Sequence, residues 1–293
     1  MDLREGEKVL TLSAPAKINW FLQVLRKRDD GYHDISSLMQ YVALSDTLTM
    51  EHSDEIEVVS DLNIPQEENL VHKAALLMRE WSGIKAGVRI TLKKEIPMSA
   101  GLGGGSSDAA TSLLGLSRLW NLDLTPKELS EIGEALGSDV PFFFHGPVAV
   151  VEGRGEIVSP VRLKSAYPLV LVKPPVAVSS AWAYAQVNVT QEAKVLTKKH
   201  NNIKLFRQGL ENGDFSLLSS LHRNDLEPLV VKRFPIIREI KQKLMLIGAV
   251  FSAMSGSGST VFGVFRTDEE ADRAADELSA NWCKAVKTVI SYS

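Results

Sequence analysis

The sequence predicts an α+β protein with two domains. Its 293 residues suffice for one large or two ordinary domains. Strand-like and helix-like segments are mixed without the regular strand–helix–strand alternation of a doubly wound fold. A glycine-rich stretch, residues 96–110, lies between a predicted strand and a predicted helix. We place the domains at residues 1–159 and 160–293, because Pro160 and nearby charged residues interrupt the pattern there.

The first domain opens with extended structure. Residues 9–24 predict extended structure with a turn at Pro15, and within it residues 18–24 alternate with the period of a half-buried strand. The charged residues 26–31 predict a hairpin loop. The other elements expected before the glycine-rich stretch are short strands at 46–51 and 55–59, a helix capped by Asn69 with the apolar stripe Leu70, Ala74, Leu77, Met78 and Trp81, and a strand at 87–94.

A helix is expected directly after the glycine-rich stretch, at residues 106–120. Thr125 and Glu128 have the spacing of a capping box with Pro126 between them, which predicts a further helix through Leu136. The remaining elements expected are strands at 148–152, 169–172, 250–254, 260–265 and 286–290, a short helix with Trp182 and Tyr184, a surface loop at 188–202, and helices at 203–211, 234–246 and from Thr267 to about Ala280.

Composition narrows the possible functions. Apolar residues make up 44% and charged residues 24%, as in a soluble globular protein. A net charge of −3 argues against a general binder of nucleic acid or of anionic membranes. The single cysteine, Cys283, excludes an intrachain disulfide, and the six histidines show no metal-binding spacing. With no apolar signal core and no membrane-spanning run, we expect a cytoplasmic protein.

The glycine-rich stretch predicts a phosphate cradle. Four glycines occupy five positions, and glycine permits both positive φ and close approach of the backbone to a ligand. The start of the following helix adds unpaired N–H groups, which suit a nucleoside triphosphate. A flexible turn with a serine N-cap is the structural alternative. The residues expected to contact the nucleotide are Pro97, Met98, Ser99, Ala100, Gly101, Leu102, Gly103, Gly104, Gly105, Ser106 and Ser107.

Two common glycine loops do not fit this stretch. A Walker A loop requires a lysine directly after its last glycine, and none is present here. A dinucleotide-binding loop requires a third glycine where Ser106 stands. Ser106 and Ser107 instead offer hydroxyl groups to a phosphate, or to a metal ion held by the phosphates.

Two charged residues in apolar surroundings are candidates for chemistry. Lys17 is either a cation that steadies a transferring phosphate or a strand-edge lysine. Asp139, which precedes Pro141 and three phenylalanines, is either a general base or a helix N-cap. Asp108 falls in the first turn of the expected helix, and its role stays open.

Three stretches together resemble the motifs of a known family. Ala14–Asn19, the glycine-rich stretch and Met254–Phe262 are similar, in this order, to the three motifs of the GHMP kinases, which include galactokinase, homoserine kinase and mevalonate kinases. The resemblance extends from about Leu12 to Phe265. It implies a two-domain GHMP kinase fold, a nucleotide-binding N-terminal domain like ribosomal protein S5, and an active site in the cleft between the domains. It also implies ATP and Mg²⁺, whose protein ligands the sequence leaves unidentified.

The resemblance assigns roles to single residues. Asp139 would accept the proton of a substrate hydroxyl while Lys17 stabilises charge. The strings Gly31-Tyr32-His33 and Leu136–Phe143 look like those members of the family whose small-molecule substrate bears a cytidine diphosphate group. Tyr32 and His33 would then grip the cytosine, with Tyr184 facing Tyr32. The residues expected on the substrate side are Asn19, Tyr32, His33, Tyr184, Gly256, Ser257 and Gly258.

Three other functions remain to be distinguished. One is a GHMP kinase that acts on homoserine or mevalonate. Neither of these substrates contains a nucleobase on which aromatic rings could stack. Another is a GHMP-fold protein that binds nucleotide without catalysis, and the third is a dinucleotide-dependent oxidoreductase. We expect no nucleic-acid or membrane partner, and a monomer or a weak homodimer.

Overall fold

The computed structural model describes residues 9–61, 64–188, 196–279 and 281–291. Contacts divide the chain into two compact units that are each discontinuous in sequence. Unit 1 comprises residues 1–16, 44–98 and 103–145, and unit 2 comprises residues 17–43, 99–102 and 146–293. The predicted boundary at 159/160 divides the chain into two continuous domains, whereas these units group residues by their contacts in space. That boundary stays a prediction.

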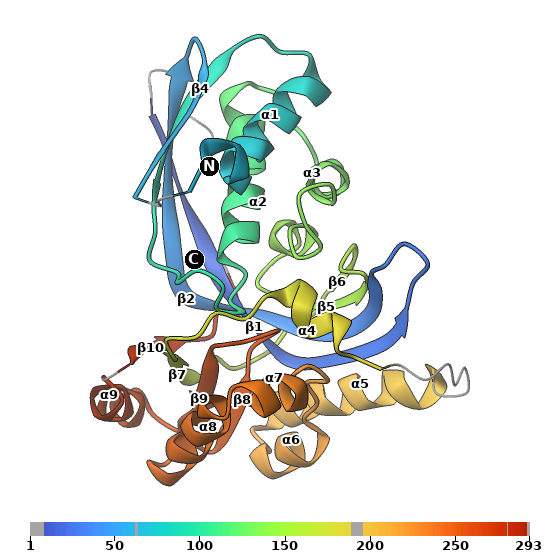
Figure 1. Ribbon diagram of the computed structural model, residues 1–293, viewed down its shortest axis with the longest axis vertical. Helices are drawn as coiled ribbons and strands as arrows, with labels where there is room; N and C mark the ends of the chain where they lie inside the picture. The colour runs from blue at the N-terminus through green and yellow to red at the C-terminus, as the bar shows by residue number, and fades with distance from the viewer. Residues whose placement is uncertain (1–8, 62–63, 189–195, 280, 292–293) are drawn as a thin grey trace. The chain divides into compact units, whose positions relative to one another are not determined.

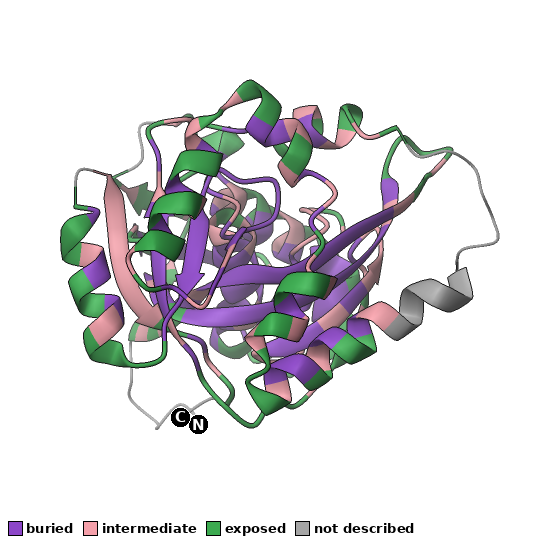
Figure 2. Ribbon diagram, turned by 90° about the horizontal axis from the view of Figure 1, so that it is seen from below, coloured by how far each residue is buried: buried purple, intermediate pink, exposed green. Residues whose placement is uncertain are grey.

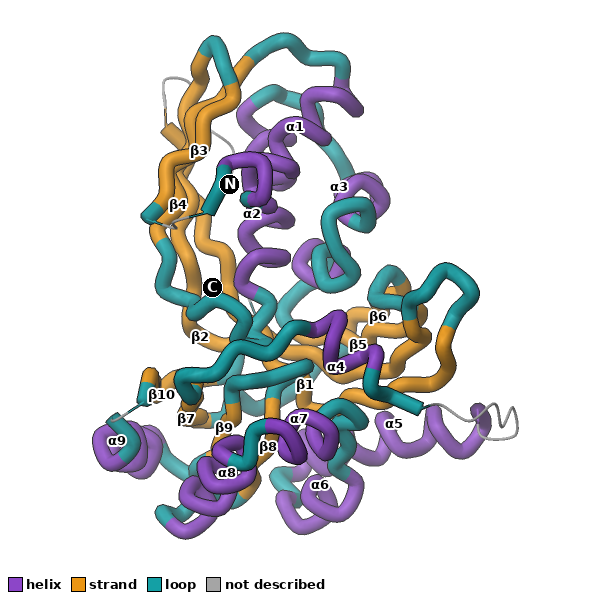
Figure 3. The backbone as a smooth tube through the Cα atoms, in the orientation of Figure 1, coloured by secondary structure: helices purple, strands orange, loops and turns teal. Residues whose placement is uncertain are grey.

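Figures 1 and 3 show the elements, which mix strands and helices as expected. Up to residue 145 they are β1 (Val9–Lys27), β2 (His33–Ser53), β3 (Ile56–Ser60), α1 (Leu70–Ser82), β4 (Gly87–Lys93), α2 (Gly104–Leu119), α3 (Pro126–Gly133) and a 3₁₀ turn at Pro141–Phe144. After it they are β5 (Val148–Gly153), β6 (Ile157–Pro160), β7 (Pro168–Lys173), α4 (Ser180–Ala185), α5 (Leu196–Asn212), α6 (Phe215–Leu221), α7 (Glu227–Arg233), α8 (Ile236–Leu246), β8 (Phe251–Met254), β9 (Val261–Val264), α9 (Asp268–Glu277) and β10 (Trp282–Lys287).

Unit 1 combines strands with a pair of packed helices. Residues 47–53 of β2 pair antiparallel with β4, and β4 pairs parallel with β3. Helices α1 and α2 pack against each other. Asn69 caps α1 as predicted, through a hydrogen bond from Val71 N. The buried stripe of α1 is Val71, Ala74, Ala75 and Met78, so the prediction of Trp81 on that stripe is wrong: its side chain is 52% exposed.

Unit 2 contains the other end of β2 and a second sheet. Residues 35–40 of β2 pair antiparallel with β5, which pairs with β6. The second sheet has the order β10-β7-β9-β8, and all its pairs are antiparallel. Apolar residues of β7, β9, α7 and α8 form one buried core with the neighbouring strands and helices. Met254 and Val261, which flank the serine–glycine turn between β8 and β9, both belong to this core.

The N-terminal strands are longer and more buried than the sequence pattern predicts. β1 continues through Pro15 without a turn, and β2 includes the whole of residues 46–51. Residues 16–24 are all buried, so both faces of this part of β1 are covered instead of one. Figure 2 shows long stretches of buried strand in the interior. Proline fits within a strand wherever its position requires no N–H donor for the hydrogen bonds of the sheet, so Pro15 does not force a turn. An alternating pattern shows that one strand face is buried, but it does not show whether the other face is covered as well.

Several other boundaries differ from the expectations. α2 begins at Gly104, α3 ends at Gly133, and β10 lies at Trp282–Lys287, where it pairs along the full length of β7. The expected loop at 188–202 includes residues outside the described ones, and from Leu196 it is helix α5. β6, α6 and α7 were not expected, because short elements carry little periodicity. None of the helices in the described residues has both the length and the apolar character needed to span a membrane.

Candidate active site

Lys17 is held by a chain of buried polar side chains within unit 2. Its Nζ donates to Asn19 Oδ1 at 2.7 Å, and Asn19 Nδ2 donates to Ser37 Oγ at 2.8 Å. Ser37 Oγ in turn donates to the backbone oxygen of Phe21. Lys17 is only 3% exposed, which does not fit a solvated strand-edge lysine. Burying an ammonium group is costly without such partners, so this arrangement fixes the position of a cation.

The serine–glycine turn lies against Lys17. Gly256 has φ +55°, and a Cβ there would come 3.1 Å from Asn19 Oδ1 and 3.2 Å from Lys17 Nζ. A side chain at Gly256 would therefore occupy the space beside the lysine. Asn224 holds the turn from behind, because its Nδ2 donates to the backbone oxygens of Met254 and Gly256, each at 2.9 Å.

The same turn contacts the glycine-rich stretch within unit 2. Ser255 Oγ donates to Gly101 O at 2.9 Å, and Thr260 N donates to Ala100 O at 3.0 Å. A Cβ at Gly101, whose φ is +74°, would lie 2.2 Å from Ser255 O. Only glycine allows this approach. The third motif therefore packs beside the glycine-rich stretch.

The predicted base-binding residues Tyr32, His33 and Tyr184 take part in two contacts of aromatic rings. The rings of His33 and Tyr184 stack with centroids 5.6 Å apart and planes 28° from parallel. The Arg154 guanidinium lies over the Tyr32 ring, 5.2 Å from its centroid. Tyr184 therefore stacks on His33, which the sequence did not predict, and its expected position facing Tyr32 stays a prediction.

His33 carries an unsatisfied polar atom. Its Nε2 is buried and has no hydrogen-bond partner among the described residues. Burial, with a smaller contribution from the charge of Lys27, lowers the pKa of His33 below its ordinary 6.5. The imidazole is therefore neutral at pH 7 and can donate at one nitrogen and accept at the other. Such a group suits the edge of a nucleobase.

In unit 1, the start of α2 has the form expected of an anion site. Gly103 is the N-cap with φ +70°, and Gly104, Gly105 and Ser106 form the first turn. The first N–H groups of a helix have no intrahelical partner and carry partial positive charge. Ser107 is fully buried, and its Oγ has no hydrogen-bond partner among the described residues. This hydroxyl is available to a ligand at the helix N-terminus.

Asp139 lies on the turn between α3 and the 3₁₀ segment, and its side chain is half-buried. The N-cap of that segment is Val140, so the capping interpretation of Asp139 is wrong. The neighbouring Gly137 is close to the start of α2, because a Cβ at Gly137 would lie 3.8 Å from Ser106 Oγ. The fold therefore brings the Asp139 segment to the serine end of the glycine-rich stretch.

A buried ionic cluster near the same helix was missed from the sequence. Lys94 Nζ lies 2.5 Å from Asp46 Oδ2 and 2.6 Å from Asp108 Oδ2. Burial and the carboxylate of Asp46 raise the pKa of Asp108 to about 7, against the opposing attraction of Lys94. Asp108 is the fifth residue of α2 and not part of its first turn. Two acidic residues far apart in the chain give no local signal that they share one lysine.

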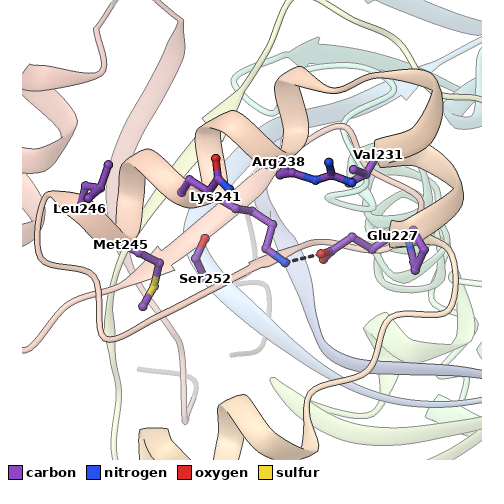
Figure 4. A pocket seen from close by; sticks show the side chains of 9 residues that line it. Glu227, Val231, Arg238, Lys241, Met245, Leu246 and Ser252 are labelled. Carbon is purple, nitrogen blue, oxygen red and sulfur yellow. Dashed lines mark hydrogen bonds and ion pairs between the residues drawn. The ribbon is translucent and has the colours of Figure 1, made fainter.

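A groove elsewhere on unit 2 contains none of the predicted site residues (Figure 4). Its volume is about 760 Å³, and residues of α7, α8 and β8 line it. Lys241 and Glu227 form an ion pair in its wall. The described residues contain no group of three or more histidine, cysteine, aspartate or glutamate side chains arranged to hold a metal ion.

Comparison with known proteins identifies the family. Residues 69–147 match the GHMP kinases N terminal domain, and residues 202–284 match the GHMP kinases C terminal domain. A curated relative from Thermodesulfovibrio yellowstonii, named 4-diphosphocytidyl-2-C-methyl-D-erythritol kinase, is 48% identical over 96% of this chain and 99% of its own length. The chain belongs to the GHMP kinase family. It is thus an ATP-dependent small-molecule kinase with the two-domain fold of that family.

Other GHMP kinases agree in sequence and structure. A relative of the same name from Geobacter metallireducens is 42% identical over 94% of this chain and 96% of its own. A crystal structure of 4-(cytidine 5'-diphospho)-2C-methyl-D-erythritol kinase superposes with a TM-score of 0.80 at 32% identity, covering 97% of this chain and 100% of that one. Homoserine kinase from Cytophaga hutchinsonii, with a TM-score of 0.77 and coverage of 99% and 98%, is 19% identical and therefore shares the fold alone.

Proposed function

We propose that this GHMP kinase transfers the γ-phosphate of ATP to the 2-hydroxyl of 4-diphosphocytidyl-2-C-methyl-D-erythritol, in non-mevalonate isoprenoid precursor biosynthesis. The products are ADP and the 2-phosphate of the substrate. Relatives named for this substrate align with nearly the whole chain. The structural observation that carries the proposal is the buried His33 Nε2, which has no partner in the described residues and lies beside the Tyr184 ring.

Cytosine recognition follows from the chemistry of these rings. The base presents acceptors at O2 and N3 and a donor at N4, so a neutral imidazole can satisfy one of them. Tyr184 and Tyr32 provide π faces on which a base can stack. Homoserine and mevalonate have no aromatic base, and a site built around a buried, unpaired His33 nitrogen disfavours them.

The glycine-rich stretch holds the triphosphate in this proposal. The N–H groups at the start of α2 face the phosphates, together with Ser106 and Ser107. Mg²⁺ fits this setting, because the buried Ser107 Oγ is an unpartnered oxygen ligand among the described residues. A magnesium ion held there with ATP would supply positive charge to the phosphate oxygens.

Phosphoryl transfer needs positioned charge more than covalent chemistry. Asp139 accepts the proton of the 2-hydroxyl as the oxygen attacks, and Lys17 stabilises the charge that develops on the transferring group. Asn19 keeps the Lys17 ammonium in place through the 2.7 Å hydrogen bond. Gly256 keeps the space beside Lys17 open to substrate, because a side chain there would fill it, and Ser257 and Gly258 continue this turn on the substrate side.

A substrate panel tests this assignment. ADP release is measured with ATP and Mg²⁺ in the presence of the cytidyl substrate, homoserine or mevalonate. Turnover with the cytidyl compound alone is the expected result. Turnover with another acceptor would keep the kinase mechanism and discard the cytosine site. ATP binding without turnover on any acceptor would favour a non-catalytic nucleotide-binding protein.

A further inference from the structure

The ionic cluster of unit 1 is buried to a degree that requires an explanation. The side chains of Asp46, Lys94 and Asp108 are 0%, 9% and 4% exposed. Removing three charges from water is costly, and their mutual attraction only partly offsets that cost. Apolar residues of similar volume often stabilise a fold equally well in such a place. Stability alone therefore does not account for the cluster.

The cluster joins the two ends of the glycine-rich stretch. Asp46 Oδ1 accepts hydrogen bonds from Glu95 N at 2.6 Å and Ile96 N at 2.8 Å, the residues that lead into Pro97. Asp108 belongs to the second turn of α2, where the stretch ends. Lys94 bridges the two carboxylates. Both the entry to the stretch and the exit from it are thereby tied to one ammonium group.

The ends are also in close packing contact. A Cβ at Gly104 would lie 2.9 Å from Ile96 Cγ2 and 3.3 Å from Lys94 Nζ. The lysine therefore lies against the first residue of α2, whose N–H groups face the proposed phosphate site. Hydrogen bonds and ion pairs are directional, whereas apolar contacts tolerate sliding. The cluster can fix the direction of the helix start in a way that apolar packing cannot.

We propose that Asp46, Lys94 and Asp108 form a positioning triad that locks the two ends of the glycine-rich stretch together and sets the helix N-terminus for the ATP triphosphate. These residues act through the backbone of the stretch and the start of α2. The proposal rests on the phosphate-binding role given above to the glycine-rich stretch. It assigns the triad to nucleotide binding and not to recognition of the acceptor.

The main test replaces the whole triad with neutral side chains of similar shape. In the triple variant Asp46→Asn, Lys94→Met, Asp108→Asn, no buried charge is left unpaired, and the amide oxygen introduced at position 46 can still accept the two backbone N–H bonds. We expect a wild-type melting temperature and unchanged CMP affinity, with ATP affinity lowered and KM for ATP raised about tenfold or more. Lys127→Met is the matched control, because Lys127 is 86% exposed and pairs only loosely with Glu131. It should change nothing.

Two single variants keep the test decisive. Lys94→Arg preserves both ion pairs, so it should keep more of the ATP affinity than the triple variant does. Asp108→Asn leaves Lys94 neutralised by Asp46, so it should fold even if the triple variant does not, and should weaken ATP binding severalfold. Wild-type ATP affinity in a folded triple variant, or in Asp108→Asn, would overturn the proposal. An equal loss of CMP affinity and thermal stability would reduce the triad to a structural role.

The outcome is separable from that of the proposed function. ATP affinity is measured without any acceptor, so an enzyme that fails to phosphorylate the cytidyl substrate still reports on the triad. CMP affinity and the melting temperature are the two controls for correct folding of the variants. If the wild-type protein does not bind CMP, the melting temperature serves as the only control. If it does not bind ATP, the triad proposal fails together with the phosphate role of the glycine-rich stretch.

Discussion

At the scale of single residues, the candidate site contains buried polar side chains that are held by hydrogen bonds to one another. Lys17 Nζ, Asn19 and Ser37 form one hydrogen-bonded chain, and each member is almost fully buried. Each bond restricts the rotamer of the next side chain, so the ammonium group has little freedom before any substrate binds. Such preorganisation is what charge stabilisation of a transferring phosphate requires.

Asp139→Asn tests the general base. The substitution keeps the shape of the side chain and removes its ability to accept a proton, so kcat should fall by roughly 10²-fold or more while ATP affinity changes little. Steady-state kinetics with the cytidyl substrate and equilibrium ATP binding measure the two quantities. Glu131→Gln, at an exposed acidic position of α3, is the control. A near-wild-type kcat in Asp139→Asn would remove Asp139 from this role.

Gly101→Ala tests the contact between the glycine-rich stretch and the serine–glycine turn. Gly101 has φ +74°, and an added Cβ would lie 2.2 Å from Ser255 O, a backbone atom that cannot move freely. Gly213→Ala is the control, because Gly213 has φ +64° with no atom within 4 Å of the added Cβ. The control should lose about 1–2 kcal/mol of stability from backbone strain and retain activity.

The Gly101 variant should be less stable than this control and should also lose most of its kinase activity. Thermal unfolding and steady-state kinetics report the two effects. Equal stability of the two variants would show that the approach of Ser255 O to Gly101 relaxes at no cost, and the close contact would then have no bearing on the site.

At the scale of elements, Glu227 links three parts of unit 2. It stands at the start of α7, accepts a hydrogen bond from Lys241 of α8, and accepts another from Met254 N of β8 at 3.0 Å. Met254 immediately precedes the serine–glycine turn. Burial alone would raise the pKa of Glu227, but His222, Lys241 and the Met254 N–H together lower it to about 2. His222 Nε2 lies 3.8 Å away, so Lys241 and Met254 are the direct partners.

Glu227→Gln should make stability depend less on pH. The pKa of Glu227 is lower in the folded protein than its ordinary 4.5, so its ionisation stabilises the fold above pH 4.5 and this contribution is lost as pH falls toward 2. The contribution at pH 7 is on the order of 3 kcal/mol. Urea unfolding at several pH values should show a wild-type advantage at pH 7 that shrinks below pH 4.5. An advantage that is the same at pH 3 and pH 7 would contradict the assignment.

At the scale of the whole molecule, the two compact units share single chain segments. β1 and β2 each contribute residues to both units, and the glycine-rich stretch passes from unit 2 to unit 1 at Gly103. The catalytic candidates are divided in the same way, with Lys17 in unit 2 and Asp139 in unit 1. If Lys17 and Asp139 have the proposed roles, the two units each contribute one catalytic residue.

CMP should stabilise the protein against heat. A ligand present at about 100 times its Kd adds about 2.7 kcal/mol to the stability of the folded state, which raises Tm by a few degrees in a protein of this size. Homoserine at the same concentration should leave Tm unchanged. His33→Ala should abolish the shift with CMP, whereas the exposed His52→Ala should preserve it. A full CMP shift in the His33 variant would move the base-binding site elsewhere.

Much of the candidate site could be predicted because its parts are local in sequence. The motif residues around Lys17, Gly101 and Ser255 stand in short strings, and glycines at close spacing indicate a ligand-binding backbone wherever they occur. The caps at Asn69 and Thr125 were predictable for the same reason, since each cap satisfies an N–H only two or three residues away. The pairing of Tyr184 with His33 was not, because it joins residues far apart in the chain.

The sequence by itself determined the family, the kinase chemistry, the position of the glycine-rich stretch and the type of most of the longer elements. The family and the kinase chemistry follow from the resemblance of three short motifs, and the other two depend on backbone freedom or periodicity within a few residues. Only the tertiary structure decided that residues 16–24 of β1 are buried on both faces, that Gly101 contacts Ser255, and that Asp46 and Asp108 share Lys94. These contacts form because the burial of apolar surface brings distant segments together. A charged side chain that is buried in this way pairs with an opposite charge that the packing places beside it, since an unpaired buried charge is costly.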